Sequence, residues 1–434
     1  MRVCRSDVKS FAFLGKDQVM KTQTSKIHML KIFKVSFYLF PLGFFLLHGW
    51  INSVAFILAF LAIYLIWQAP DRLRFDIYSK MVAFTLAGNI IAVFLTSLLR
   101  YHFLGPMFDG PAHYLLAIPI FLAIRHYRLN ITNFLEYAIP SSLILFACHF
   151  FYHPTFFPVA PTEILRVNAP AINDPNLFGI YTMTLGFFCF FSIDWPLKME
   201  LGLIIKTLGF IIGVGFSLFA YSRSGWVVGI ILICYFLWLI RRQLNYRKLF
   251  LLCLSLFLLI LFAIFINHHI HARLADTLHE ILTWFNGKDK DTSSGTRLTM
   301  WLISWRLFEL HPFVGYGDHQ LLPYFHNTFI TQIATPLALD IMQKIGPHND
   351  LLQNMVFSGI FGLIATLAVL FIPLFLFNKI KLKTNLKASI EKTCRLGTCF
   401  ILGIFTGGFF NVMLGLKMSV SFYAILVFAL LAEV

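Results

Sequence analysis

Apolar runs of membrane-crossing length recur along almost the whole chain, and polar residues gather in two places, residues 1–32 and 267–349. A transmembrane helix needs about 20 mainly apolar residues. By that measure the pattern predicts twelve spans, at 33–49, 51–69, 80–99, 111–125, 132–152, 176–193, 200–221, 224–240, 249–267, 351–378, 397–414 and 417–433. We therefore expect an all-α polytopic membrane protein with one long, partly helical loop between helices 9 and 10.

The composition supports this class of protein. Of the 434 residues, 58% are hydrophobic and only 13% are charged, whereas soluble domains carry about 25% charged residues. None of the seven cysteines lies in the long polar loop, so no disulfide framework is indicated.

The basic residues are distributed unevenly, and their distribution predicts the topology. With the N-terminus inside, the cytoplasmic segments hold 24 Lys and Arg residues and the short outer loops hold 4. Positive residues collect on the cytoplasmic side of membrane proteins. The predicted divisions are a basic cytoplasmic segment at 1–32, helices 1–9 at 33–267, an outward-facing loop at 268–347, and helices 10–12 with a short C-terminus at 348–434. We expect residues 1–32 to precede an uncleaved anchor.

The net charge of +15 raises the question of a nucleic-acid partner. The outward loop, however, is nearly neutral, with six Lys and Arg residues against seven Asp and Glu residues. The excess charge is therefore a topology signal, and we expect a lipid bilayer and no nucleic acid as partner.

Two arginine motifs stand at predicted helix starts. In Ser222-Arg223-Ser224-Gly225 either serine can cap the following span, and in Ser293-Ser294-Gly295-Thr296-Arg297 the cap candidates are Ser294 and Gly295. The second motif opens an amphipathic helix over Thr296–Leu310, which Pro312 ends. A helix start and a guanidinium both favour phosphate. The alternatives are an arginine that contacts lipid head groups and an ordinary capped interfacial helix.

His348 follows Pro347 at the start of the tenth span. A helix N-terminus disfavours imidazolium, and a neutral imidazole can act as a general base. Three other signals are weaker. Asp289-Lys290-Asp291 is expected to form a solvated turn, His268-His269-x-His271 a polar collar, and Asn173-Asp174-Pro175-Asn176 a helix cap. No metal site and no cofactor are predicted.

Together these motifs resemble the bacterial O-antigen ligase family. The resemblance covers roughly residues 170–375 and depends on Ser-Arg-Ser-Gly at 222–225, Ser-Gly-Thr-Arg at 294–297 and His348-Asn349-Asp350-Leu351, in this order around a long outer loop. The superfamily also contains O-antigen polymerases and bacterial protein O-oligosaccharyltransferases, and both remain alternatives. A transporter is a less favoured alternative, since the spans carry few ionisable residues.

The resemblance implies a metal-independent glycosyltransferase of lipopolysaccharide biosynthesis in the bacterial inner membrane. Its donor would be a glycan on undecaprenyl diphosphate and its acceptor the lipid A–core, with the long loop and the active site in the periplasm. The resemblance also implies that Arg223 and Arg297 hold the diphosphate and that His348 acts as base. Ser222, Ser224, Ser294, Thr296 and Asn349 are the expected substrate contacts.

Overall fold

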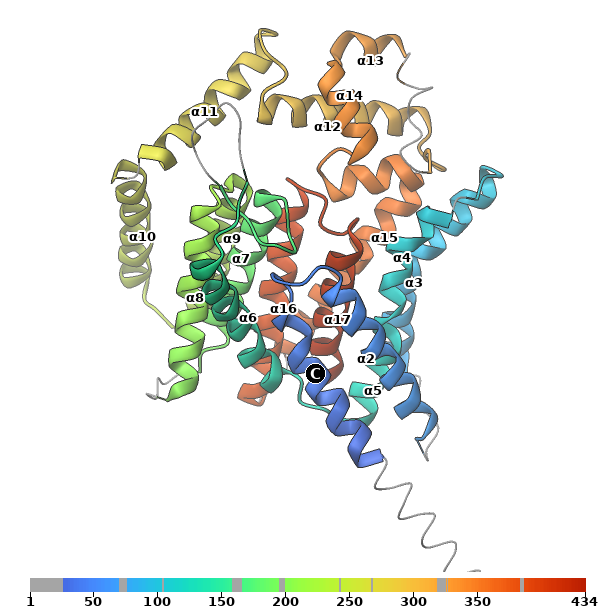
Figure 1. Cartoon of the computed structure of the whole chain (residues 1–434), viewed down its shortest axis with the longest axis vertical. Helices are drawn as coiled ribbons and strands as arrows, with labels where there is room; N and C mark the ends of the chain where they lie inside the picture. Colours follow the sequence, from blue (N-terminus) through green and yellow to red (C-terminus); the bar gives the residue numbers. More distant parts are fainter. Residues whose placement is uncertain are drawn as a thin grey trace, which may run out of the picture.

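The computed structural model describes residues 26–69, 76–103, 105–157, 166–194, 200–241, 243–266, 268–317, 325, 327–382 and 386–434. Most of these residues are helical, and seven helices within the described ranges are long and apolar enough to cross a membrane (Figure 1). The all-α polytopic class is therefore confirmed, whereas the number of twelve spans stays a prediction. Of the basic segment expected at 1–32, residues 1–25 lie outside the described residues.

A helix lies over each stretch where the apolar pattern predicts a span. The stretch at 111–125 is divided between two helices, and α15 runs beyond its predicted ends. The helix over the first span ends at 42 instead of 49, and the helix over the span expected at 397–414 covers 388–408. The bundle helices are a first helix over 26–42, α2 (Trp50–Trp67), α3 (Ile77–Leu99), α4 (Gly105–Leu115), α5 (Ala117–Tyr127), α6 (Thr132–Tyr152), α7 (Pro175–Phe191), α8 (Leu201–Phe219), α9 (Arg223–Ile240), α10 (Tyr246–Ile266), α15 (Asp350–Lys381), α16 (Ala388–Gly408) and α17 (Lys417–Glu433).

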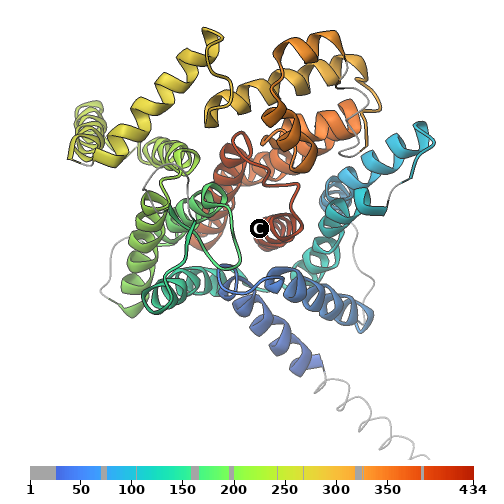
Figure 2. The ribbon, with the colours of Figure 1, turned by 45° about the horizontal axis from the view of Figure 1, so that its top comes forward.

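Two helices, α7 and α17, are buried on nearly all faces and form the centre of the bundle, as Figure 2 shows for α17. A helix that is apolar all round is expected in such a position. Aromatic rings fill the space beside them. The Phe44 ring stacks on Phe422 at 4.4 Å and meets Tyr181 edge-on at 4.7 Å. Helix α8 packs directly on α7, because a Cβ at Gly213 would lie 2.6 Å from the Cα of Gly186.

The long polar stretch forms a helical cap at one end of the bundle (Figure 1). It contains α11 (His268–Phe285), α12 (Ser293–Leu310), α13 (Thr328–Ile333) and α14 (Pro336–Lys344). The last three helices share a small apolar core that includes Ile303, Leu307 and Met342. Helix α10 stands apart from the other membrane helices in both ribbon views and leads into α11. A two-stranded sheet, β1 (Phe156–Phe157) with β2 (Arg166–Val167), lies in the loop before α7.

Helix α15 is interrupted near the end that faces the cap, which the continuous span expected at 351–378 does not anticipate. Ser358 and Gly359 leave the helical conformation, with φ of −129° and 56°. The loop after α12 bridges the interruption. Tyr316 N–H donates to the Val356 carbonyl at 2.8 Å, and Ile360 N–H donates to the Pro312 carbonyl at 2.7 Å. This part of α15 is therefore held to the cap.

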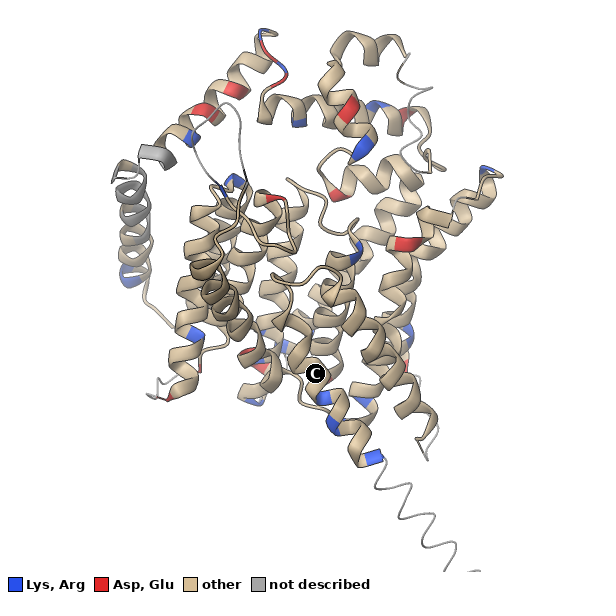
Figure 3. Ribbon diagram, in the orientation of Figure 1, with Lys and Arg blue, Asp and Glu red and all other residues tan. Residues whose placement is uncertain are grey.

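The opposite end of the bundle contains a buried group of charges. Lys206 and Lys392 lie 2.7 and 2.8 Å from the same carboxylate oxygen of Glu136. Asp194 adds a second carboxylate, 3.1 Å from Lys392. From sequence, Lys206 is expected to reach the membrane surface, but it is only 4% exposed and is paired inside the protein. Between the two ends the ribbon carries few charges (Figure 3).

Candidate active site

Arg223 is the first residue of α9, at the end of the bundle that faces the cap. Ser222 is the N-cap, as expected, and accepts the N–H of Gly225 at 3.1 Å. The Arg223 guanidinium leaves the helix and contacts α11. Its Nη1 donates to Thr277 Oγ1 at 2.7 Å and lies 3.1 Å from a Glu280 carboxylate oxygen. The first arginine motif is therefore joined to the first helix of the cap.

Arg297 lies on α12, one turn further along the helix than the sequence pattern predicts. The helix begins at Ser293, and its N-cap is Thr292 instead of Ser294 or Gly295. Thr292 outranks the two candidates because its hydroxyl reaches the N–H of Gly295. The Arg297 Nη1 has a weak contact to Ser293 Oγ at 3.4 Å, and its Nε is buried without a hydrogen-bond partner in the described part of the chain.

Glu280 connects the two arginine motifs. The same oxygen that faces Arg223 accepts the N–H of Ser294 at 2.9 Å, in the first turn of α12. Burial raises the pKa of Glu280, but hydrogen bonds from the side chain and the N–H of Ser294, together with the charge and the hydrogen bond of Arg223, lower it overall. The carboxylate is therefore ionised at neutral pH. It holds the starts of α9 and α12 close together.

Two further arginines, Arg166 on β2 and Arg273 on α11, belong to the same cluster. Arg166 Nε donates to the Ala220 carbonyl and its Nη2 to Asn176 Oδ1, both at 2.8 Å. Arg273 Nε is buried, and no described residue accepts its hydrogen. The arrangement brings four guanidinium groups to the interface between bundle and cap.

Neighbouring arginine charges act on three of these guanidinium groups, those of Arg166, Arg273 and Arg297. Burial, followed by the charge of Arg273, lowers the pKa of Arg166 to about 10. Burial, followed by the charge of Arg223, lowers the pKa values of Arg273 and Arg297. The cluster therefore holds more positive charge than its described carboxylates neutralise, and an anion would relieve the repulsion.

His348 lies two residues before α15, since Asn349 is the N-cap and accepts the N–H groups of Leu351 and Leu352. The histidine backbone is left-handed, with φ of 51°, which is uncommon for a residue other than glycine. Trp301 on α12 fixes the preceding residue, because its Nε1 donates to the Pro347 carbonyl at 3.1 Å. The histidine and Arg297 are thereby attached to one rigid element.

The pKa of His348 is lowered, in the direction that the sequence predicts but mainly by another cause. Burial has the largest effect and Arg297 the next, while a hydrogen bond to the side-chain oxygen of Asn411 and the charge of Asp174 oppose them. The imidazole is therefore neutral near pH 7. A neutral imidazole beside an anion site suits proton abstraction from a hydroxyl.

Comparison with known proteins bears directly on this arrangement. Residues 208–367 match the family model described as O-antigen ligase. The chain carries an O-antigen ligase family domain. A Haemophilus influenzae protein, described only as uncharacterized, is 24% identical over 331 residues, which cover 73% of this chain and 78% of that protein.

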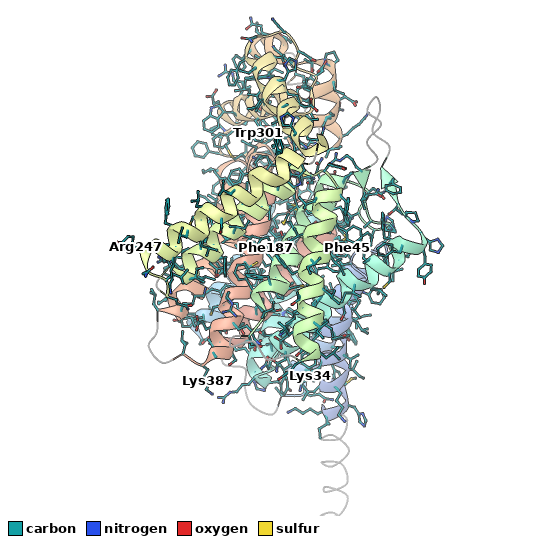
Figure 4. The ribbon with its side chains drawn as sticks, turned by 90° about the vertical axis from the view of Figure 1, so that its left-hand side faces the viewer. Lys34, Phe45, Phe187, Arg247, Trp301 and Lys387 are labelled. Carbon is teal, nitrogen blue, oxygen red and sulfur yellow. The ribbon has the colours of Figure 1, made fainter. Side chains whose placement is uncertain are left out.

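The ligase domain runs from α8 into α15, and so contains Arg223, Arg273, Arg297 and His348. Arg166 lies outside it and reaches the same cluster from the loop before α7. The cap stands at the end of the molecule away from Lys34 and Lys387, as the position of Trp301 in Figure 4 shows. The site is therefore at the end opposite to that where most basic residues of the bundle collect.

The residues expected to contact substrate form hydrogen bonds to other residues within 208–367. Ser222 and Asn349 cap helices, Ser224 Oγ lies 3.1 Å from Ser222 Oγ, and Thr296 faces the Lys290 carbonyl at 3.4 Å. All four are buried. Ser294 is partly exposed, and both its backbone N–H and its side chain contact Glu280. Their role as substrate contacts stays a prediction.

The weaker motifs also have defined places. Asp289 accepts the N–H of Asp291 in an exposed turn, and Asp174 caps α7, both as expected. The side chains of His268 and His269 lie outside the described residues, and His271 is exposed. Within the described ranges no group of three or more His, Cys, Asp and Glu residues is placed to hold a metal ion.

Proposed function

We propose that the protein is an O-antigen ligase that transfers a glycan from undecaprenyl diphosphate to the lipid A–core at the periplasmic face of the inner membrane. The observation that carries this proposal is the four-arginine cluster beside His348. A diphosphate leaving group develops negative charge as its bond to the sugar breaks, and fixed positive charge aimed at that position lowers the barrier.

The arginines divide between anchored and unsatisfied donors. Arg166 is anchored by two hydrogen bonds and Arg223 by Thr277 and Glu280. The buried Nε groups of Arg273 and Arg297 have no described partner. An unsatisfied buried donor is costly, and a phosphate oxygen would satisfy it. The anchored pair would set the geometry, and the other pair would close on the diphosphate.

His348 supplies the second chemical requirement. The acceptor hydroxyl oxygen forms a bond to the anomeric carbon, the bond between that carbon and the diphosphate oxygen breaks, and the hydroxyl proton passes to the imidazole. The electron pair of the broken bond leaves on undecaprenyl diphosphate, next to the arginines. No oxidant, nucleotide or further co-substrate is needed for this balance.

The test is transfer in proteoliposomes with purified lipid-linked glycan and lipid A–core. Lysine keeps the charge but not the planar pair of donors. Arg297→Lys and Arg223→Lys should slow transfer about 30- to 1000-fold, as expected for losing one aimed contact of about 2–4 kcal/mol. Arg306→Lys is the matched control, because Arg306 lies on the same helix, is 38% exposed and pairs with Glu309. Near-normal transfer by both site variants would contradict the proposal.

The acceptor decides between the ligase and its alternatives. Transfer to lipid A–core identifies a ligase, whereas lengthening of the glycan on its lipid carrier, without lipid A–core, identifies a polymerase. Transfer only to a protein identifies a protein O-oligosaccharyltransferase. Movement of intact lipid-linked glycan across the bilayer without cleavage would identify a transporter.

The periplasmic position of the site is tested by cysteine labelling in spheroplasts, in a background without native cysteines. Lys288 is exposed in the cap and Lys387 is exposed at the opposite end. Lys288→Cys should react with a membrane-impermeant thiol reagent in intact spheroplasts, and Lys387→Cys should react only after permeabilisation. The reverse result would place the site in the cytoplasm and contradict the proposed donor and acceptor.

A further inference from the structure

Asn411, in the loop between α16 and α17, contacts two groups that are distant in the sequence. Its Oδ1 lies 3.2 Å from His348 Nδ1, and its Nδ2 donates to Asp174 Oδ2 at 2.5 Å. The second oxygen of Asp174 accepts the N–H of Asn176 at 2.8 Å and caps α7. Asp174, Asn411 and His348 therefore form a chain of hydrogen bonds across three elements.

The partners of Asn411 fix the orientation of its amide. Oδ1 also accepts the N–H of Val412 at 2.8 Å, and Nδ2 faces the Asp174 carboxylate. Rotating the amide by half a turn would place its NH₂ against a backbone N–H and its oxygen against a carboxylate. The group that faces His348 is therefore the carbonyl oxygen, which can only accept a hydrogen bond.

An acceptor beside Nδ1 requires that Nδ1 carry the proton. A neutral imidazole has one N–H, so the lone pair is then on Nε2. Nε2 has no hydrogen-bond partner among the described residues. Building on the proposed function, we propose that Asp174 and Asn411 are positioning residues that hold His348 in the Nδ1–H tautomer, so that Nε2 accepts the proton of the acceptor hydroxyl.

The charges around His348 fit this role. Arg297 faces it from α12 and Asp174 from the start of α7, while Asn411 contacts it from the loop before α17. An aspartate at position 411 would put a full negative charge beside the imidazole ring and stabilise imidazolium. The neutral amide orients the ring with much less stabilisation of imidazolium, and the Asp174 side chain acts one hydrogen bond away.

Three variants test the inference through the pH profile of transfer. In Asn411→Leu the acceptor is lost, so kcat should fall about 10- to 100-fold with the donor KM within about twofold. The acid limb of the profile should move to lower pH, because the hydrogen bond that His348 donates to Asn411 raises the pKa of His348. Asn411→Asp should move the acid limb to higher pH. Asp174→Asn keeps a good N-cap and should give a smaller loss in kcat.

The control is Asn378→Leu, which removes one side-chain hydrogen bond on α15 to the Leu374 carbonyl, far from the site. It should leave both kcat and the acid limb unchanged. The positioning role of Asp174 and Asn411 would be overturned if the acid limbs of Asn411→Leu and Asn411→Asp coincide with that of the wild type while His348→Ala is inactive. Full transfer by His348→Ala would instead remove the base from the proposed function, so the two failures are distinguishable.

Discussion

The charge cluster at the end of the bundle opposite the cap allows a sharp prediction about stability. Glu136 is the shared carboxylate of Lys206 and Lys392, and these side chains are only 7%, 5% and 11% exposed. Glu136→Gln keeps the shape of the side chain and removes its charge. Two buried lysines then depend on Asp194, which is 66% exposed.

The size of the effect follows from the contacts that remain. Removing one partner of a buried ion pair costs about 3–5 kcal/mol, because the other charge stays buried. Lys206 keeps the Ser192 carbonyl at 3.0 Å and Asp194 at 3.7 Å, and Lys392 keeps Asp194 at 3.1 Å. These contacts reduce the expected loss in the free energy of unfolding to about 2–4 kcal/mol.

Denaturant unfolding of the purified protein in detergent, followed by near-UV circular dichroism, measures this loss. Asp340→Asn is the control, since Asp340 and Lys344 form a pair 2.8 Å apart whose side chains are 53% and 69% exposed. That variant should lose less than about 1 kcal/mol. Equal stability of Glu136→Gln and the wild type, or an equal loss in the control, would refute the reasoning.

Three further predictions concern the site and its support. His348→Ala should keep donor binding while transfer falls about 100- to 10,000-fold. Burial and Arg297 lower the pKa of His348 below 6.5, so wild-type transfer should be constant near neutral pH and fall only below pH 6.5. If His348→Gln keeps most of the activity and the acid limb of the pH profile is unchanged, the role of His348 as general base is contradicted. Transfer should persist in excess EDTA, and loss restored by Mg²⁺ would assign a role to Asp289 and Asp291. Gly359→Ala should lower stability by about 1–3 kcal/mol, since its φ is 56° and a Cβ would lie 2.6 Å from Phe313 backbone atoms, whereas Gly215→Ala meets open space and should not.

The helical membrane class could be predicted, because the length of an apolar run is a local property of the chain. The interruption of α15 could not be predicted, since the residues that hold it, Pro312 and Tyr316, come from the loop after α12. The pairing of Lys206 was missed for a similar reason. Its partner Glu136 is 70 residues away, and hydropathy gives no sign of their contact.

At the site, the two motif arginines and His348 could be predicted because each stands near a helix start. Arg166 and Arg273 stand in no motif. The charge rule does not single out Arg166, because Arg100, Arg223 and Lys417 are likewise the single Lys or Arg of a predicted short outer loop. Asn411 could not be found at all, because its role depends on contacts 63 and 237 residues away.

At the proposed periplasmic site, the interruption of α15 would also set the depth of His348 relative to the bilayer. An unbroken helix of 32 residues would rise about 48 Å at 1.5 Å per residue, far more than the hydrocarbon thickness of about 30 Å. Divided at Gly359, the inner segment from 360 to 381 rises about 33 Å, close to that thickness. The eight outer residues from 350 to 357 form a spacer of about 12 Å. That spacer would raise His348 to the level of lipid phosphates, where a diphosphate on a polyprenyl chain would reach it without leaving the membrane.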